Sequence, residues 1–230
     1  MDSSEILQLF NKTIIGDYED EGAWEAVSAL HGHGDRETFE TAAKWIRAQE
    51  PLKRARAADV LAQLRQPGWS GTGEPIRMFR EESFVLVVEM LEAEGEPLVL
   101  SSGISALGHL RKSASIPVIL KHLNHPDQDV RLSAAMALGS FPDDELAISG
   151  LLALTGDEDA GVREEAAVGL GKRRDIRLLP VLRGMLDAPD LKLRVAEAAS
   201  ALLGLPEDPA EWKVEDYKDS LNKQFGYDAA

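Results

Sequence analysis

The sequence predicts an all-α solenoid of about six helical hairpins with a C-terminal capping helix. An apolar segment that ends in a leucine recurs along the chain, and its leucines are Leu30, Leu61, Leu107, Leu138, Leu170 and Leu202. The spacings are 31, 46, 31, 32 and 32 residues, and 31–32 is a typical solenoid period. Small residues precede these leucines by three or four positions, as in Ala134–Ala135 and Ala166–Ala167. Small side chains let neighbouring helices approach closely, so the pattern predicts stacked hairpins.

Each predicted hairpin has a first helix that ends about fifteen residues before its leucine and a second helix that contains the leucine. The predicted first helices are 4–15, 36–49, 80–94, 115–123, 144–154 and 175–186. The predicted second helices are 20–31, 52–66, 97–110, 127–140, 160–171 and 191–204. Asp35, Asp143 and Asp175 have the residue type and position of helix N-caps.

Two segments depart from the repeat. The long spacing before Leu107 contains an insertion at 66–79, whose glycines and prolines predict a loop. Segment 206–230 places Trp212, Tyr217, Leu221 and Phe225 on one side of a helix. We therefore expect a solenoid over 1–205 and a segment over 206–230 that covers the last hairpin, because terminal repeats need capping.

Composition narrows the classes of function. Charged residues make up 28% of the chain and the net charge is −15, which disfavours nucleic acid and anionic membranes as partners. There are no cysteines, which excludes disulfides and thiolate sites. The first residues do not have the pattern of a signal peptide, and no apolar run approaches the ~18 residues of a membrane span. We expect a cytoplasmic monomer.

Catalytic and metal-binding signatures are absent from the sequence. We find no nucleophile elbow, phosphate-binding loop or dinucleotide fingerprint. The pairs His31–His33 and His122–His125 have no third ligand at a helical spacing. We predict no catalytic residue, cofactor or metal ion.

The sequence of the repeated units resembles HEAT repeats, of the short bacterial type also named for phycobilisome-lyase subunits. The resemblance rests on Asp129-Val130-Arg131, on Val162-Arg163, on the paired alanines, and on Pro117 and Pro180 in first helices, and it is strongest over 113–204. It implies a right-handed superhelix whose second helices line a concave surface, where most members bind proteins. A few members attach or detach bilins, and a distinct group binds alkylated DNA.

A repeated arginine stands seven positions before three of the leucines, as Arg54, Arg131 and Arg163. These arginines could form a basic ladder for a ligand. We prefer a structural role, in which each arginine meets an acidic residue of the inter-helix turns, such as Asp127, Asp129 or Asp159, and so joins one hairpin to the next.

One stripe of the second helices is the candidate binding surface. It consists of the positions five before, two before and two after each leucine, which share a helix face. The stripe residues that we predict to bind a partner are Arg56, Asp59, Ser102, Ser105, His109, Ser133, Met136, Ser140, Glu165, Val168 and Lys172. An ordinary solvated face is the alternative.

The insertion is a second candidate contact. It carries Trp69 near Arg65, Arg77 and Arg80, and an aromatic beside arginines is typical of interfaces. Alternatively, Trp69 folds back and seals the junction between hairpins. The surrounding stretch 44–80 has eight bases against three acids, which suggests a patch for an acidic segment or a phosphate.

We therefore predict a non-catalytic scaffold that binds a protein partner. An accessory subunit of a bilin lyase-type enzyme is the alternative that the resemblance implies. A DNA-binding helical-repeat protein is the third, and Glu25, Glu165 and Glu197 on the stripe argue against it.

Overall fold

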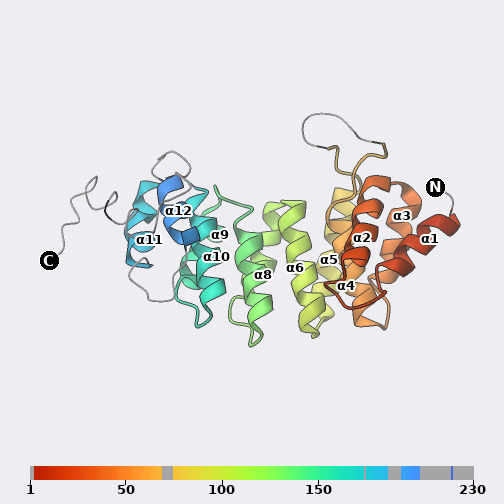
Figure 1. Cartoon of the computed structure of the whole chain (residues 1–230), viewed down its shortest axis with the longest axis horizontal. Helices are drawn as coiled ribbons and strands as arrows, with labels where there is room; N and C mark the ends of the chain where they lie inside the picture. Colours follow the sequence, from red (N-terminus) through yellow and green to blue (C-terminus); the bar gives the residue numbers. More distant parts are fainter. Residues whose placement is uncertain (1–2, 69–74, 174, 186–192, 203–218, 220–230) are drawn as a thin grey trace. The chain divides into compact units, whose positions relative to one another are not determined.

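The computed structural model describes residues 3–68, 75–173, 175–185, 193–202 and 219. Within these ranges the chain is helical, with one isolated antiparallel bridge between Arg65 and Arg77 (Figure 1). The chain divides into two compact units, residues 1–119 and 120–230. The predicted all-α solenoid fold is confirmed, and each predicted hairpin has its two helices.

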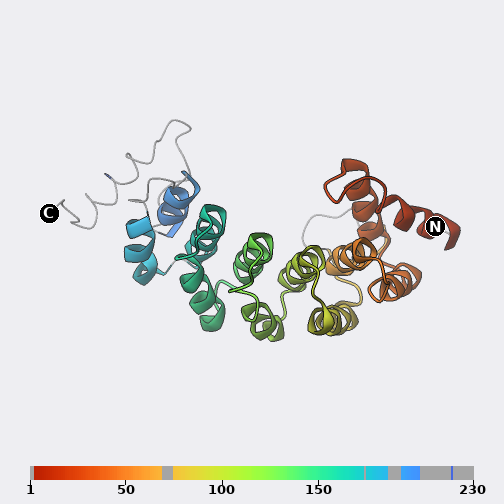
Figure 2. The same cartoon turned by 90° about the horizontal axis from the view of Figure 1, so that it is seen from below.

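The first unit contains the first three hairpins. Its helices are α1 (Ser3–Lys12), α2 (Glu21–His33), α3 (Arg36–Trp45), α4 (Pro51–Ala62), α5 (Arg80–Ala93) and α6 (Pro97–Leu110). A 3-10 turn at Ser113–Ser115 then leads into α7 (Ile116–Leu120) at the boundary between the units. Figure 2 shows α4 and α6 side by side in one layer, with α3 and α5 in the other.

The second unit repeats this arrangement. Its helices are α8 (Gln128–Leu138), α9 (Glu145–Leu154), α10 (Ala160–Gly171), α11 (Leu179–Met185) and α12 (Leu193–Leu202), with a 3-10 turn at Ile176–Leu178. Helix α10 packs against α8 on one side, against α12 on the other, and against α9 of its own hairpin. The second helices of the hairpins thus form one layer of this unit.

Small residues lie where the layers meet, as the sequence predicts. Ala134, Ala135, Ala166 and Ala167 are completely buried. A Cβ added at Gly169 would come within 2.9 Å of the Leu151 side chain. The repeat leucines are also buried, with exposed fractions of 0–1% at Leu30, Leu61, Leu107, Leu138 and Leu170.

Most helix starts agree with the predicted caps. The Asp35 carboxylate accepts a hydrogen bond of 2.8 Å from the Thr38 N–H and begins α3. The predicted cap Asp143 is wrong by one residue, because the Asp144 carboxylate accepts from the Leu146 N–H at 2.9 Å. The first helix also ends earlier than predicted, at Lys12, and the chain then turns at Gly16 with a φ of 82°.

The two ends of the insertion pair with each other at its base. The Gln66 N–H donates to the Ile76 carbonyl and the Met78 N–H donates to the Leu64 carbonyl, both at 2.9 Å. Trp69 lies outside the described residues. So does the predicted capping segment 206–230, apart from residue 219.

None of the helices in the described residues is long and apolar enough to cross a bilayer.

Candidate functional site

The repeated arginines are structural, because they bind turns rather than facing solvent. Arg131 Nε and Nη2 donate to the two Asp157 carboxylate oxygens at 2.8 and 2.9 Å, and Arg131 Nη1 donates to the His125 carbonyl at 2.9 Å. Arg131 comes from α8 and Asp157 from the turn of the next hairpin, so the pair joins two hairpins. Burial raises the Asp157 pKa, but hydrogen bonds from Arg131 and the Asp159 N–H outweigh this and lower it.

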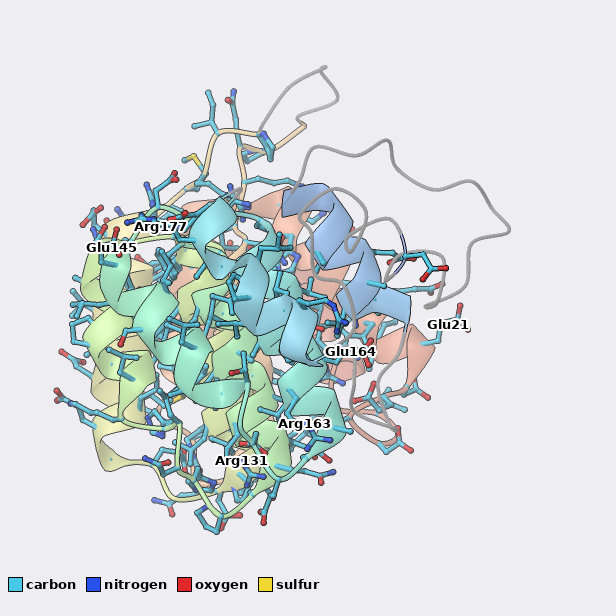
Figure 3. The ribbon with its side chains drawn as sticks, turned by 90° about the vertical axis from the view of Figure 1, so that its left-hand side faces the viewer. Glu21, Arg131, Glu145, Arg163, Glu164 and Arg177 are labelled. Atoms are coloured by element: carbon cyan, nitrogen blue, oxygen red, sulfur yellow. The ribbon has the colours of Figure 1, made fainter. Side chains whose placement is uncertain are left out.

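The hydrogen bonds to turn carbonyls recur at the other two repeat arginines, and Arg54 also binds a carboxylate of the next hairpin. Arg54 Nε and Nη2 donate to Glu94 at 2.7 and 3.1 Å, and its Nη1 donates to the Ala48 and Gln49 carbonyls. Arg163 Nη1 donates to the Asp157 carbonyl at 2.7 Å. Figure 3 shows Arg131 and Arg163 at the same end of the second unit.

Arg54 and Arg131 therefore bind other carboxylates than the predicted acidic partners, although their predicted role is right. Asp127 accepts from the Asp129 N–H at 2.9 Å and caps α8, while Asp159 accepts from the Val162 N–H at 3.0 Å and caps α10. The carboxylates that Arg54 and Arg131 bind come from the turn of the following hairpin, because the fork of each of these two guanidinium groups reaches across to it.

A buried polar cluster occupies part of the predicted stripe in the first unit. The Arg56 side chain is completely buried. Its Nε donates to the Thr13 carbonyl and its Nη2 to the Tyr18 carbonyl, both at 2.7 Å, while Nη1 lies 3.5 Å from Asp59 Oδ2. The guanidinium is also stacked 4.3 Å from the Tyr18 ring centre and 4.7 Å from that of Trp24.

Tyr18 ties three elements together. Its hydroxyl donates to the Asp59 carboxylate, with oxygen–oxygen distances of 3.0 and 3.1 Å, and lies 2.8 Å from Ser102 Oγ. Asp59 comes from α4 and Ser102 from α6, whereas Tyr18 lies between α1 and α2. Hydrogen bonds of Tyr18 therefore join the segment before α2 to the second helices of the next two hairpins.

Burial shifts the pKa values within this cluster. It raises the Asp59 pKa to about 6, against hydrogen bonds from Tyr18 and the nearby charge of Arg56. It lowers the His31 pKa to about 4, although the His31 Nε2 lies 2.9 Å from the Asp59 carbonyl. The Tyr18 pKa is raised by burial and by the Asp59 charge. At neutral pH the cluster therefore holds a neutral imidazole and an ionised Asp59.

This cluster corrects the prediction for three stripe residues. Arg56, Asp59 and Ser102 have exposed fractions of 0%, 8% and 2%, so they do not form an open surface. Tyr18 and Trp24 cover them, since the first hairpin departs from the repeat and α2 packs against α4. These two aromatic residues could have indicated the buried cluster from the sequence, because they lie in the hairpin whose sequence differs most from the repeat.

The remaining stripe residues stay accessible. In the first unit Ser105 is half-buried and His109 is exposed. In the second unit the half-buried members are Ser133, Ser140, Glu165 and Val168, and the exposed members are Met136 and Lys172. The Glu165 carboxylate lies 3.0 Å from Arg194 of α12. Helices α8 and α10 thus share a solvent-facing surface, which we call the α8–α10 face: Ser133, Met136, Ser140, Glu165, Val168 and Lys172.

The described residues hold no group of three or more histidine, aspartate or glutamate side chains that could bind a metal ion.

Comparison with known families agrees with this architecture. HEAT repeats match residues 85–154 and 116–203, which together span more than half of the chain. The chain belongs to the HEAT-repeat family. This covers the hairpins in which Arg131 and Arg163 make the same turn contacts. No protein of curated function matches the sequence significantly.

One solved structure has a similar fold at low sequence identity, and two others match with TM-scores below 0.5. An engineered protein is 17% identical with a TM-score of 0.55, and the match covers 89% of this chain and 96% of that one. The CpcE–CpcF complex of phycocyanin lyase from Nostoc sp. PCC7120 is 18% identical with a TM-score of 0.49, covering 96% and 83%. Human deoxyhypusine hydroxylase is 14% identical with a TM-score of 0.41, covering 98% and 97%.

Proposed function

We propose that this HEAT-repeat chain is a non-catalytic scaffold that binds a protein partner on the α8–α10 face. The observation that carries the proposal is Met136, which is 54% exposed between the buried Ala135 and Ala137. Val168 occupies the equivalent position on α10 and is half-buried. Two apolar side chains thus point away from the core at the same register of neighbouring helices.

The composition of the face supports protein binding. Methionine is flexible and polarizable, and it adapts to the shape of an apolar partner surface. Ser133 and Ser140 are short, so a partner could approach the helices closely. The charged members, Glu165 and Lys172, leave Met136 and Val168 as an apolar centre, and protein interfaces are depleted of charge at their centres.

Three further residues keep their predicted role as part of this proposal. Ser105 and His109 occupy the equivalent register on α6 of the first unit, where they remain accessible. Trp69 of the insertion is proposed as an additional contact, on the grounds of its residue type and its neighbouring arginines.

The test compares two variants that each place a charge on the surface of the second unit. Met136→Glu alters the α8–α10 face, whereas Leu146→Glu alters an equally exposed apolar residue of α9, which is 57% exposed. Partners are isolated with the tagged wild-type chain from its native host and identified by mass spectrometry, and their affinities are then measured with purified proteins.

We expect Met136→Glu to weaken binding by tenfold or more, about 1.4 kcal/mol, because a charge would be desolvated at the centre of the contact. Leu146→Glu should leave the affinity unchanged, and circular dichroism should show that both variants are folded. Equal affinities for the wild type and Met136→Glu would exclude the α8–α10 face as the binding surface.

A further inference from the structure

Three polar residues of the first unit are buried on a helix face that the repeat leaves accessible. They are Arg56 and Asp59 of α4 and Ser102 of α6. Met136 of α8 and Val168 of α10 stand at the position equivalent to that of Asp59, two residues before the repeat leucine, and both are accessible. The packing of repeated helices therefore does not bury the polar group, and a part of the chain outside the repeat covers it.

The segment that covers this group is residues 13–20, which joins α1 to α2 and which we call the strap. It consists of turns and bends rather than a helix, and it reverses direction at Gly16, whose φ is 82°. Ile15 is 64% exposed, and Asp17 and Glu19 are exposed as well. The middle of the strap is therefore not anchored in the apolar core.

The strap is bound to α4 and α6 by polar contacts. Arg56 donates to the main-chain carbonyls of Thr13 and Tyr18, both at 2.7 Å. The Tyr18 hydroxyl donates to Asp59 Oδ2 at 3.0 Å and lies 2.8 Å from Ser102 Oγ. Every peptide has main-chain carbonyls, whereas the contact with Asp59 and Ser102 requires a side chain with the length and the hydroxyl of tyrosine. The site thus has the chemistry of a peptide-binding site.

Opening of the strap would uncover polar groups rather than an apolar surface. Arg56, Asp59 and Ser102 would then exchange their hydrogen bonds with the strap for hydrogen bonds with water, and such an exchange has a small net cost. Attachment to α1 and α2 keeps the strap at a high effective concentration beside its site. The strap therefore holds the site closed, and a segment of another protein with the same groups competes with it.

We propose that the strap is autoinhibitory, and that the surface it covers on α4 and α6 binds a non-helical, tyrosine-containing segment of a partner protein. In the open state Arg56 binds main-chain carbonyls of that segment, and Asp59 and Ser102 bind its tyrosine hydroxyl. Trp24 of α2, whose ring centre lies 5.5 Å from that of Tyr18, forms the aromatic wall of the site. This site is separate from the α8–α10 face, and the proposal does not depend on the proposed function.

The test measures by fluorescence anisotropy how tightly a labelled peptide with the sequence of residues 12–20 binds to the full-length chain. The wild type is compared with an open variant, in which residues 14–18 are replaced one for one by glycine and serine so that α1 and α2 stay joined. We expect the open variant to bind the peptide at least about tenfold more tightly, because in the wild type the peptide must displace the strap.

Changes in the peptide and in the site then identify the contacts. A peptide carrying Tyr18→Phe should bind the open variant about tenfold more weakly, because it lacks the hydroxyl. Within the open variant, Asp59→Asn should weaken binding of the unmodified peptide by about tenfold and Ser102→Ala by about fivefold. Ser149→Ala, at an exposed serine of α9, is the control and should bind the peptide like the open variant.

A conservative variant of the full-length chain tests the same idea without rebuilding the strap. Tyr18→Phe keeps the ring but removes the hydroxyl, so the strap competes less well, and this variant should bind the unmodified peptide more tightly than the wild type. Equal affinities of the wild type and Tyr18→Phe would overturn the proposal. So would equal binding of the two peptides, or no binding by an open variant that circular dichroism shows to be folded, because the strap would then be a terminal cap only.

Discussion

Two single substitutions in the Tyr18 cluster should change the pH dependence of stability in opposite directions. The Asp59 pKa is raised from 3.8 to about 6, so the folded chain takes up a proton on acidification before the unfolded chain does. Acidification from pH 7 to pH 5 therefore stabilises the fold through Asp59. The His31 pKa is lowered from 6.5 to about 4, so the unfolded chain takes up that proton first, and acidification destabilises the fold through His31.

The sizes of the two effects follow from proton linkage. On acidification from pH 7 to pH 5, His31 should lower the unfolding free energy by about 2 kcal/mol, and Asp59 should raise it by about 1 kcal/mol. The two contributions largely oppose each other in the wild type. Asp59→Asn removes the stabilising one, and His31→Gln removes the destabilising one. Asparagine can still accept from the Tyr18 hydroxyl, and glutamine can still place a nitrogen near the Asp59 carbonyl.

The assay is urea unfolding at pH 7 and pH 5, followed by circular dichroism and by fluorescence of Trp24, which lies against Arg56. On acidification, the unfolding free energy of Asp59→Asn should change by about 1 kcal/mol toward lower stability compared with the change in the wild type. The unfolding free energy of His31→Gln should change by about 2 kcal/mol toward higher stability compared with the change in the wild type. A pH dependence that is the same in both variants and in the wild type would refute the assignment of these shifted pKa values to the cluster.

The remaining predictions concern the contacts between hairpins. Ala135→Leu and Ala167→Leu should each lower the unfolding free energy by about 1–3 kcal/mol, because both alanines are completely buried between helices; unchanged melting temperatures would contradict this register of the repeat. Asp157→Asn should lower it by about 1.5–3 kcal/mol by weakening the paired hydrogen bonds from Arg131. Asp129→Asn, at an exposed aspartate in the first turn of α8, should change stability by less than about 0.5 kcal/mol in the same thermal unfolding series.

The amino-acid sequence by itself determined the repeating part of this protein. The recurring leucines and paired alanines predicted the helices and their buried faces, because each hairpin of a solenoid packs mainly on its neighbours in the chain. The role of Arg131 as a link between hairpins was predicted for the same reason. The partner of Arg131 was not predicted, because Asp127, Asp129 and Asp157 are all aspartates. Only the packing of neighbouring turns brings Asp157 within reach of Arg131.

The tertiary structure alone decided what happens where the repeat breaks down. Arg56 and Asp59 occupy stripe positions, but the first hairpin does not follow the repeat, and nothing in the periodicity indicates that Tyr18 lies on top of them. The opposition of Arg65 and Arg77 likewise follows from the backbone hydrogen bonds at the base of a non-repeating insertion. Periodicity determines contacts that recur from hairpin to hairpin, whereas a contact made once in the molecule depends on how distant segments of the chain fold together.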